Sequence, residues 1–185
     1  MKILRNVATW ILLCAMLAGC CAGRRNLSDY RVGDFRAEVR IDLGELPVYA
    51  EVAAERAEGA TYAALREVRL LAPPSLAGIV LTCEDGTVML WRDGIRTAAA
   101  GAVAFWEACA LLCAEGALRS VCDTEWEGLA LDYAEIPSDT RVVEVYRDPE
   151  TGIPKRLCEG DVALTVIRFE RGQARTSLGE KKGSL

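Results

Sequence analysis

Histidine is absent from this 185-residue chain. Without an imidazole, the sequence excludes histidine general bases, Ser-His and Cys-His nucleophiles and histidine-containing zinc sites. None of the eight cysteines forms a C-x-x-C pair, and no glycine-rich stretch has a phosphate-binding pattern. We therefore expect no metal, no cofactor and no enzymatic activity.

Carboxylates and thiols are the remaining reactive groups. The sharpest acidic pair is Asp123 and Glu125 in "VCDTEWEG", which would lie on one face of a strand, as would Glu127. Solvated strand-face charges are the favoured interpretation, and a carboxylate hydrolase is the remote alternative. Cys109 and Cys113 are four residues apart in a predicted helix, with no base to lower their pKa, so packing is their default role.

The N-terminal segment has the three-part layout of a secretory signal. Lys2 and Arg5 form a basic start, residues 10–17 form an apolar run too short to span a bilayer, and small residues precede Cys20. The ending "LAGC" resembles the lipobox of bacterial lipoproteins. That resemblance implies a signal peptide over 1–19 and a diacylglycerol thioether on Cys20, which would anchor the protein to the extracytoplasmic face of a membrane. A plainly cleaved signal and an N-terminal membrane helix are the alternatives.

Cleavage before Cys20 would leave an acidic product. Removing the two basic residues shifts the net charge from −5 to −7, and only the tail "EKKGSL" is basic. Bulk neutralisation of phosphates is then excluded, so we expect no nucleic-acid partner. We divide the rest into a lipidated tether over 20–30, one domain over 31–172 and a polar tail over 173–185.

Six cysteines follow Cys20. An exported chain could pair them as disulfides, but their spacings match no known disulfide scaffold. Small core residues are the favoured interpretation for most of them, with disulfides as the alternative. The set is Cys21, Cys83, Cys109, Cys113, Cys122 and Cys158.

Alternating apolar and polar residues predict strands along most of the domain. The pattern is strict over 35–43, and weaker over 48–54, where alanine and glutamate could also form a helix. Pro73 and Pro74 end whatever precedes them. Residues 79–83 alternate up to Asp85-Gly86, which predicts a hairpin with "TVMLW", and Asp93-Gly94 predicts a second turn.

One long helix is predicted over 98–119. Its proposed buried face consists of Val103, Trp106, Cys109 or Ala110, Cys113 and Ala117. Strands resume after it, and the last places Val162, Leu164 and Val166 opposite Ala163, Thr165, Ile167 and Phe169. The sequence thus predicts a mainly β (α+β) protein, an antiparallel meander of about eight to eleven strands with one or two helices.

The order of these elements resembles the LolA/LolB-like lipoprotein-carrier superfamily. The resemblance is carried by "FRAEVRI", "APPSLAGIVL", "EDGTVMLWRDG", the helix, and "VVEVYRDPETGIPKRL" followed by "VALTVIRFE". It implies an unclosed β-barrel, a curved antiparallel sheet whose concave face is covered by a helix and encloses an apolar cavity. Solid packing of the same faces is the alternative.

Together with the predicted lipid anchor and the absence of histidine, the resemblance leads us to expect a membrane-anchored, non-enzymatic protein that binds a lipid, a lipoprotein acyl chain or an apolar peptide. An envelope sensor or assembly lipoprotein that binds another protein, for example in sporulation, is the rival hypothesis. The expected cavity wall consists of Phe35, Val39, Ile41, Val68, Leu70, Ile79, Leu81, Val88, Leu90 and Trp106.

The adjacent cysteines provide a matched test of the anchor. Cys20→Ser should abolish incorporation of a clickable fatty acid in a lipoprotein-processing bacterium, because the thioether needs the Cys20 sulfur. Cys21→Ser should leave labelling unchanged. Gel fluorescence after coupling to a dye measures both, and undiminished labelling of the Cys20→Ser protein would contradict the assignment.

Overall fold

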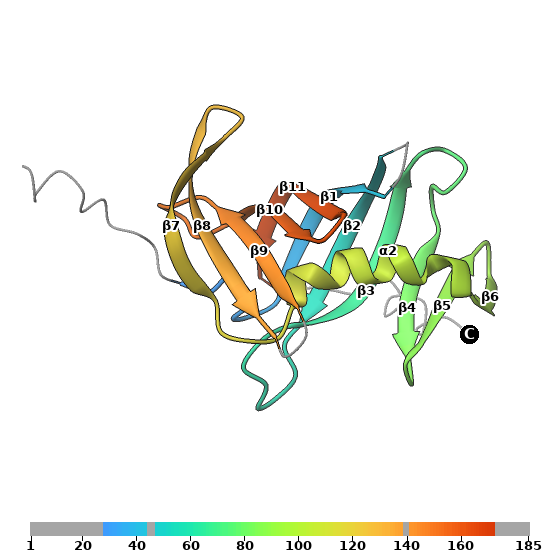
Figure 1. Ribbon diagram of the computed structural model, residues 1–185. Coiled ribbons are helices and arrows are strands. Elements are labelled where there is room, and N and C mark those ends of the chain that lie inside the picture. Colours follow the sequence, from blue (N-terminus) through green and yellow to red (C-terminus); the bar gives the residue numbers. More distant parts are fainter. Residues whose placement is uncertain (1–27, 44–46, 139–140, 173–185) are drawn as a thin grey trace, which may run out of the picture.

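The computed structural model describes residues 28–43, 47–138 and 141–172, which form one antiparallel sheet crossed by a helix (Figure 1). The strands are β1 (Phe35–Asp42), β2 (Val48–Glu55), β3 (Ala64–Ala72), β4 (Val80–Glu84), β5 (Thr87–Arg92), β6 (Ile95–Ala98), β7 (Arg119–Trp126), β8 (Leu129–Pro137), β9 (Val142–Arg147), β10 (Pro154–Glu159) and β11 (Val162–Arg171). The helical segment consists of η1 (Ala100–Ala102), α2 (Val103–Ala110) and η2 (Leu111–Cys113).

The strand order is β6-β5-β4-β3-β2-β1-β11-β10-β9-β8-β7. The first and last strands therefore pair in the middle of the sheet, and the two edges, β6 and β7, are neighbours in sequence. The helical segment joins these edges, and Figure 1 shows α2 crossing one face of the curved, unclosed sheet. The predicted fold class is confirmed.

Strand alternation places the apolar residues as expected. Phe35, Val39 and Ile41 of β1 are buried, and the alanine-rich segment over 48–54 is a strand rather than a helix. β3 ends at Ala72, directly before the two prolines. The inward side chains pack with α2 into a single core cluster, where each fully buried Val, Leu or Ile contributes about 1.5–3 kcal/mol relative to an exposed one.

The predicted hairpin turns are present. Asp85 and Gly86 have φ values of 48° and 78°, and Asp93 and Gly94 have 51° and 82°. Two positive φ values in succession match the twist of a two-residue hairpin, which explains why Asp-Gly is a strong signal. Glu127 lies in a third such turn with φ 51°, so the expectation that it shares a strand face with Asp123 is wrong.

The helix is shorter than predicted. Ala98 ends β6 and Arg119 begins β7, so the helical residues are 100–113. The buried helical residues are Ala102, Ala108, Cys109, Leu111 and Leu112, while Val103, Trp106 and Cys113 are half-buried and Ala117 is exposed beyond the helix. Of the predicted buried face, only Cys109 is fully buried. The helical segment carries alanine and leucine on several of its faces, so the sequence shows no single apolar stripe that would mark the buried one.

A bulge corrects the predicted face of β11. Val39 pairs with Val166 but Glu38 pairs with Arg168, so Ile167 is the extra residue and is 52% exposed. Because the bulge inserts one extra residue, the side chains of β11 after Ile167 point to the opposite faces from those that simple alternation predicts. Phe169 therefore lies on the core side, where its ring stacks on Phe35 at a centroid distance of 5.0 Å.

Within the described part of the chain, no helix has the length and apolar character needed to cross a membrane. The predicted signal peptide over 1–19, Cys20 and Cys21 of the tether, and the tail over 173–185 lie outside the described residues.

Gly116 turns the chain from η2 toward β7 and gives a stability prediction. Its φ is +117°, and an added Cβ would lie 2.6 Å from the carbonyl oxygen of Pro137. Gly116→Ala should lower the free energy of unfolding by about 1–3 kcal/mol, because alanine is strained at this positive φ and its Cβ would collide with the carbonyl oxygen of Pro137. Gly101→Ala, where a Cβ meets nothing within 4 Å, should change it little. Urea unfolding of both variants checks this, and equal stabilities would contradict it.

Candidate functional site

The predicted cavity-wall residues come together on the concave face of the sheet. Phe35, Val39, Ile41, Val68, Leu70, Ile79, Leu81 and Val88 are buried, and Leu90 and Trp106 are half-buried and packed against them. They form the interior between sheet and helix. Several have no exposed surface at all, so these side chains are covered by protein atoms rather than by an open space. Contact between a ligand and this wall stays a prediction, and it would require α2 to move.

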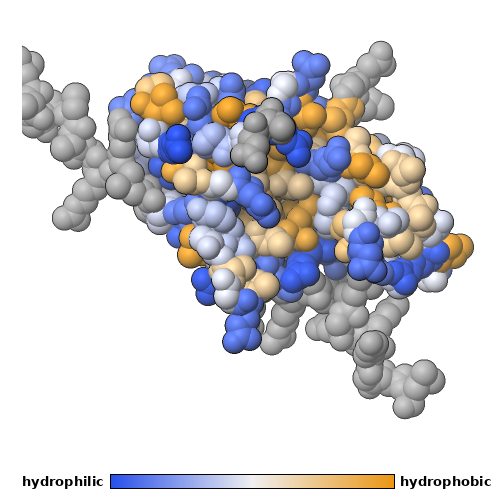
Figure 2. Space-filling view, turned by 60° about the horizontal axis from the view of Figure 1, so that its bottom comes forward, coloured by the Kyte–Doolittle hydropathy of each residue, from blue (hydrophilic) through white to orange (hydrophobic). Residues whose placement is uncertain are grey.

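An open pocket lies at the end of the helical segment. It has a volume of about 350 Å³ and is bordered by the last turn of α2, by η2, and by the nearby ends of β8, β9 and β10. Its lining residues are Glu107, Ala110, Leu111, Cys113, Ala114, Glu115, Ile136, Ser138, Arg141, Val143 and Glu159. We call it the helix-end pocket. Figure 2 shows one face of the molecule, on which hydrophobic surface (orange) lies among hydrophilic surface (blue).

The helix-end pocket has apolar walls and a charged rim. Leu111, Ile136 and Val143 are buried, and Ala110 and Ala114 add small half-buried side chains. The rim includes Glu107 and Glu115, both exposed. A concave apolar surface with a few polar groups is typical of binding sites for small apolar groups.

Arg31 fixes the end of the helical segment and hence one wall of the pocket. Its guanidinium, with no exposed surface, forms an ion pair with Asp29 at 2.6 Å. The same group donates hydrogen bonds to the carbonyl oxygens of Ala114 and, at 2.9 Å, Gly116. The Tyr62 ring lies 4.2 Å from the guanidinium carbon. Because Ala114 and Gly116 follow directly after η2, Arg31 ties the end of the helical segment to the residues that precede β1.

A second buried polar group lies on the same side of the sheet. Arg147 donates from Nε to Asp132 at 2.6 Å, and Ser120 Oγ donates to the other oxygen of Asp132 at 2.5 Å. Tyr30 Oη and Arg147 Nη1 are buried and have no hydrogen-bond partner within the described ranges. Burial raises the pKa of the Tyr30 hydroxyl, so this group stays neutral. The cluster ties β7, β8 and β9 together.

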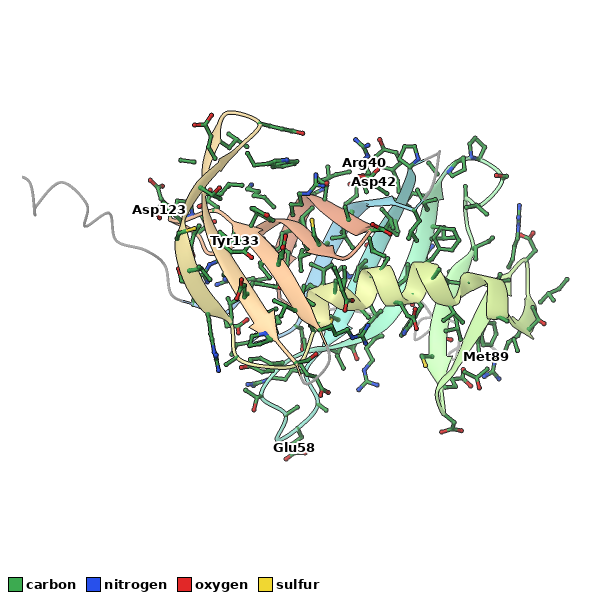
Figure 3. The ribbon with its side chains drawn as sticks, viewed as in Figure 1. Arg40, Asp42, Glu58, Met89, Asp123 and Tyr133 are labelled. Atoms are coloured by element: carbon green, nitrogen blue, oxygen red, sulfur yellow. The ribbon has the colours of Figure 1, made fainter. Side chains whose placement is uncertain are left out.

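The predicted carboxylate pair lies on the edge strand β7, where Asp123 pairs in register with Asp132 of β8. Asp123 and Glu125 are exposed. Figure 3 shows Asp123 on β7 and Glu58 in the loop between β2 and β3. The buried acids of the described region are Glu67 and Asp132. Glu67 pairs in register with Ala53, whereas Asp132 is bound by Arg147, so the two lie on different strands far apart in the sheet.

The five cysteines of the described residues are free thiols. Cys109 is buried, and Cys113 and Cys158 are half-buried. Cys83 and Cys122 are exposed, so the core interpretation is wrong for them. Cys83 lies near the turn at the end of β4, where it pairs in register with the buried Val88 of β5. Cys122 lies on the edge strand β7, most of whose residues are exposed.

The walls of the helix-end pocket are not predicted from the sequence. In the sequence pattern Leu111 is one apolar helix residue among many, and Ile136 and Val143 are ordinary inward residues of two strands. The spacing of residues 111, 136 and 143 in the sequence does not indicate that they lie close together. They line one pocket because the strand order of the sheet places β8 and β9 beside the end of the helical segment.

No family model and no curated protein matches this sequence. Among solved structures, the chain is similar to an uncharacterized conserved protein from Thermus thermophilus (16% identity, TM-score 0.48, covering 80% of this chain and 85% of that one). It is also similar to MucB (16%, 0.48, 83% of this chain and 58% of that one). A third similar structure is a Vibrio parahaemolyticus domain assigned to outer membrane lipoprotein sorting, with 9% identity and a TM-score of 0.41. The match covers 82% of this chain and 89% of that one. With values this low, none of these likenesses says what this chain binds.

Thiol reactivity tests the geometry of the pocket wall. Burial raises the pKa of the Cys113 thiol to about 12 and that of Cys109 further. Both should react with N-ethylmaleimide at least about a hundredfold more slowly than exposed Cys83 and Cys122 at neutral pH, because the thiolate is the reactive form. Mass spectrometry of a labelling time course measures this, with urea-unfolded protein as the control. Fast native labelling of Cys113 would contradict the packing of η2.

Proposed function

We propose that this protein is a membrane-tethered, non-enzymatic binding protein of the LolA/LolB-like half-barrel class, and that the helix-end pocket receives an apolar group of its ligand. The observation that carries the proposal is the pocket itself, a hollow of about 350 Å³ with buried Leu111, Ile136 and Val143 in its wall. The unclosed sheet and the helix across its concave face support the half-barrel assignment.

The size of the pocket limits what it can hold. Small-molecule sites measure about 300–1,000 Å³, so the helix-end pocket is at the lower end of that range. It suits one short apolar chain or a pair of apolar side chains. Several acyl chains would need the covered interior around Val39 and Leu81, and hence displacement of α2.

The tether is the second part of the proposal. Lipidation of Cys20 would hold the domain close to a bilayer, since the eight residues between Cys20 and Asp29 reach at most about 28 Å. The ligand would then be met at the membrane surface. The absence of histidine and the exposed positions of Asp123 and Glu125 support a binding rather than a catalytic role.

Filling the pocket should weaken the binding of an apolar probe. Ala110 is half-buried in the pocket wall, and Ala104 is exposed on the same helix. Ala110→Phe should weaken binding of the neutral dye N-phenyl-1-naphthylamine to the full-length chain at least about tenfold, because the new ring occupies the pocket. Fluorescence titration measures the dissociation constants.

Ala104→Phe is the matched control, since it adds the same ring to the same helix outside the pocket. It should bind the dye as the unchanged protein does. No dye binding by the unchanged protein, or equal binding by both variants, would overturn the proposed pocket function.

A further inference from the structure

The rim of the helix-end pocket carries an excess of negative charge. Arg141 and Glu159 neutralise each other through two contacts, Nε to Oε1 at 3.2 Å and Nη1 to Oε2 at 3.3 Å. Glu107 and Glu115 also line the pocket, and neither belongs to an ion pair within the described ranges. Among the described residues, two carboxylates without an ion-pair partner therefore line the pocket.

These charges discriminate between ligands that share the same apolar part. A fatty acid or phospholipid would bring a carboxylate or phosphate toward Glu107 and Glu115, and like charges repel. An ammonium or guanidinium beside the apolar group would be attracted instead. The two glutamates are exposed, so the effect should be moderate and should weaken as salt screens it.

We propose that the occupant of the helix-end pocket is an apolar peptide segment that carries a lysine or arginine next to its apolar anchor. The proposal rests on the proposed function, because it names the ligand class of the same pocket. The volume of about 350 Å³ fits a pair of apolar side chains better than the chains of a diacyl lipid. The basic residue then lies between Glu107 and Glu115 while the anchor contacts Leu111, Ile136 and Val143.

Three peptides that differ at one position test the charge preference. Each contains the core Leu-Phe-Leu followed by lysine, glutamine or glutamate, and each competes with N-phenyl-1-naphthylamine for the full-length protein. At low ionic strength the lysine peptide should displace the dye about three- to tenfold more effectively than the glutamate peptide, with glutamine between them. The ratio should fall toward one in high salt.

A matched pair of double variants shows which charges matter. Glu107→Gln with Glu115→Gln should remove the lysine preference, so that the lysine-to-glutamate displacement ratio falls to about one. Glu125→Gln with Glu127→Gln makes the same change in net charge on the exposed β7–β8 hairpin and should leave the preference intact.

The outcomes separate this inference from the proposed function. Dye binding that is lost in Ala110→Phe, together with equal displacement by the three peptides, would overturn the charge preference and leave the pocket function standing. Displacement by dodecanoate at concentrations where no peptide acts would favour an anionic lipid and overturn the peptide assignment. A lysine preference that survives Glu107→Gln with Glu115→Gln would also overturn it.

Discussion

The pairing of β1 with β11 is the constraint on which the rest of the structure depends. Because the first and last strands meet at the centre of the sheet, the chain builds outward to β6 and then returns from the opposite edge at β7. Residues 99–118 have to connect two edges that are the full width of the sheet apart. A route across the concave face, with apolar side chains turned to the sheet, closes the core and bridges the edges with one segment.

That crossing has to be fixed at its far end, and the segment before β1 does this. Arg31 holds the carbonyls of Ala114 and Gly116, while its neighbour Tyr30 packs edge-on against Phe35 and Phe169. The β-bulge at Ile167 brings Phe169 to this side of the sheet. The end of the helical segment is thus attached to the β1–β11 pair that made the crossing necessary.

Local chemistry explains which features were predictable. Asp85-Gly86, the alternation over 35–42 and the stop at Ala72 each depend on neighbouring residues, so the sequence shows them directly. The face of Phe169 depends on one extra residue in the pairing with β1, which no pattern within β11 reveals. The helix-end pocket depends on the sheet order, which brings Leu111 beside Ile136 and Val143 from distant parts of the chain.

The alanine content of the helical segment accounts for both a prediction error and the candidate site. Alanine on every side of α2 left no stripe from which Ala108 and Leu112 could be identified as the buried face. The same small side chains fill little space where the helix ends, since Ala110 and Ala114 line the pocket together with Ile136 and Val143 and each adds only a methyl group. Larger residues at 110 and 114 would make the periodicity plain and would fill the hollow. The sequence feature that obscures the helix face is therefore the one that leaves an apolar pocket open between Glu107 and Glu115.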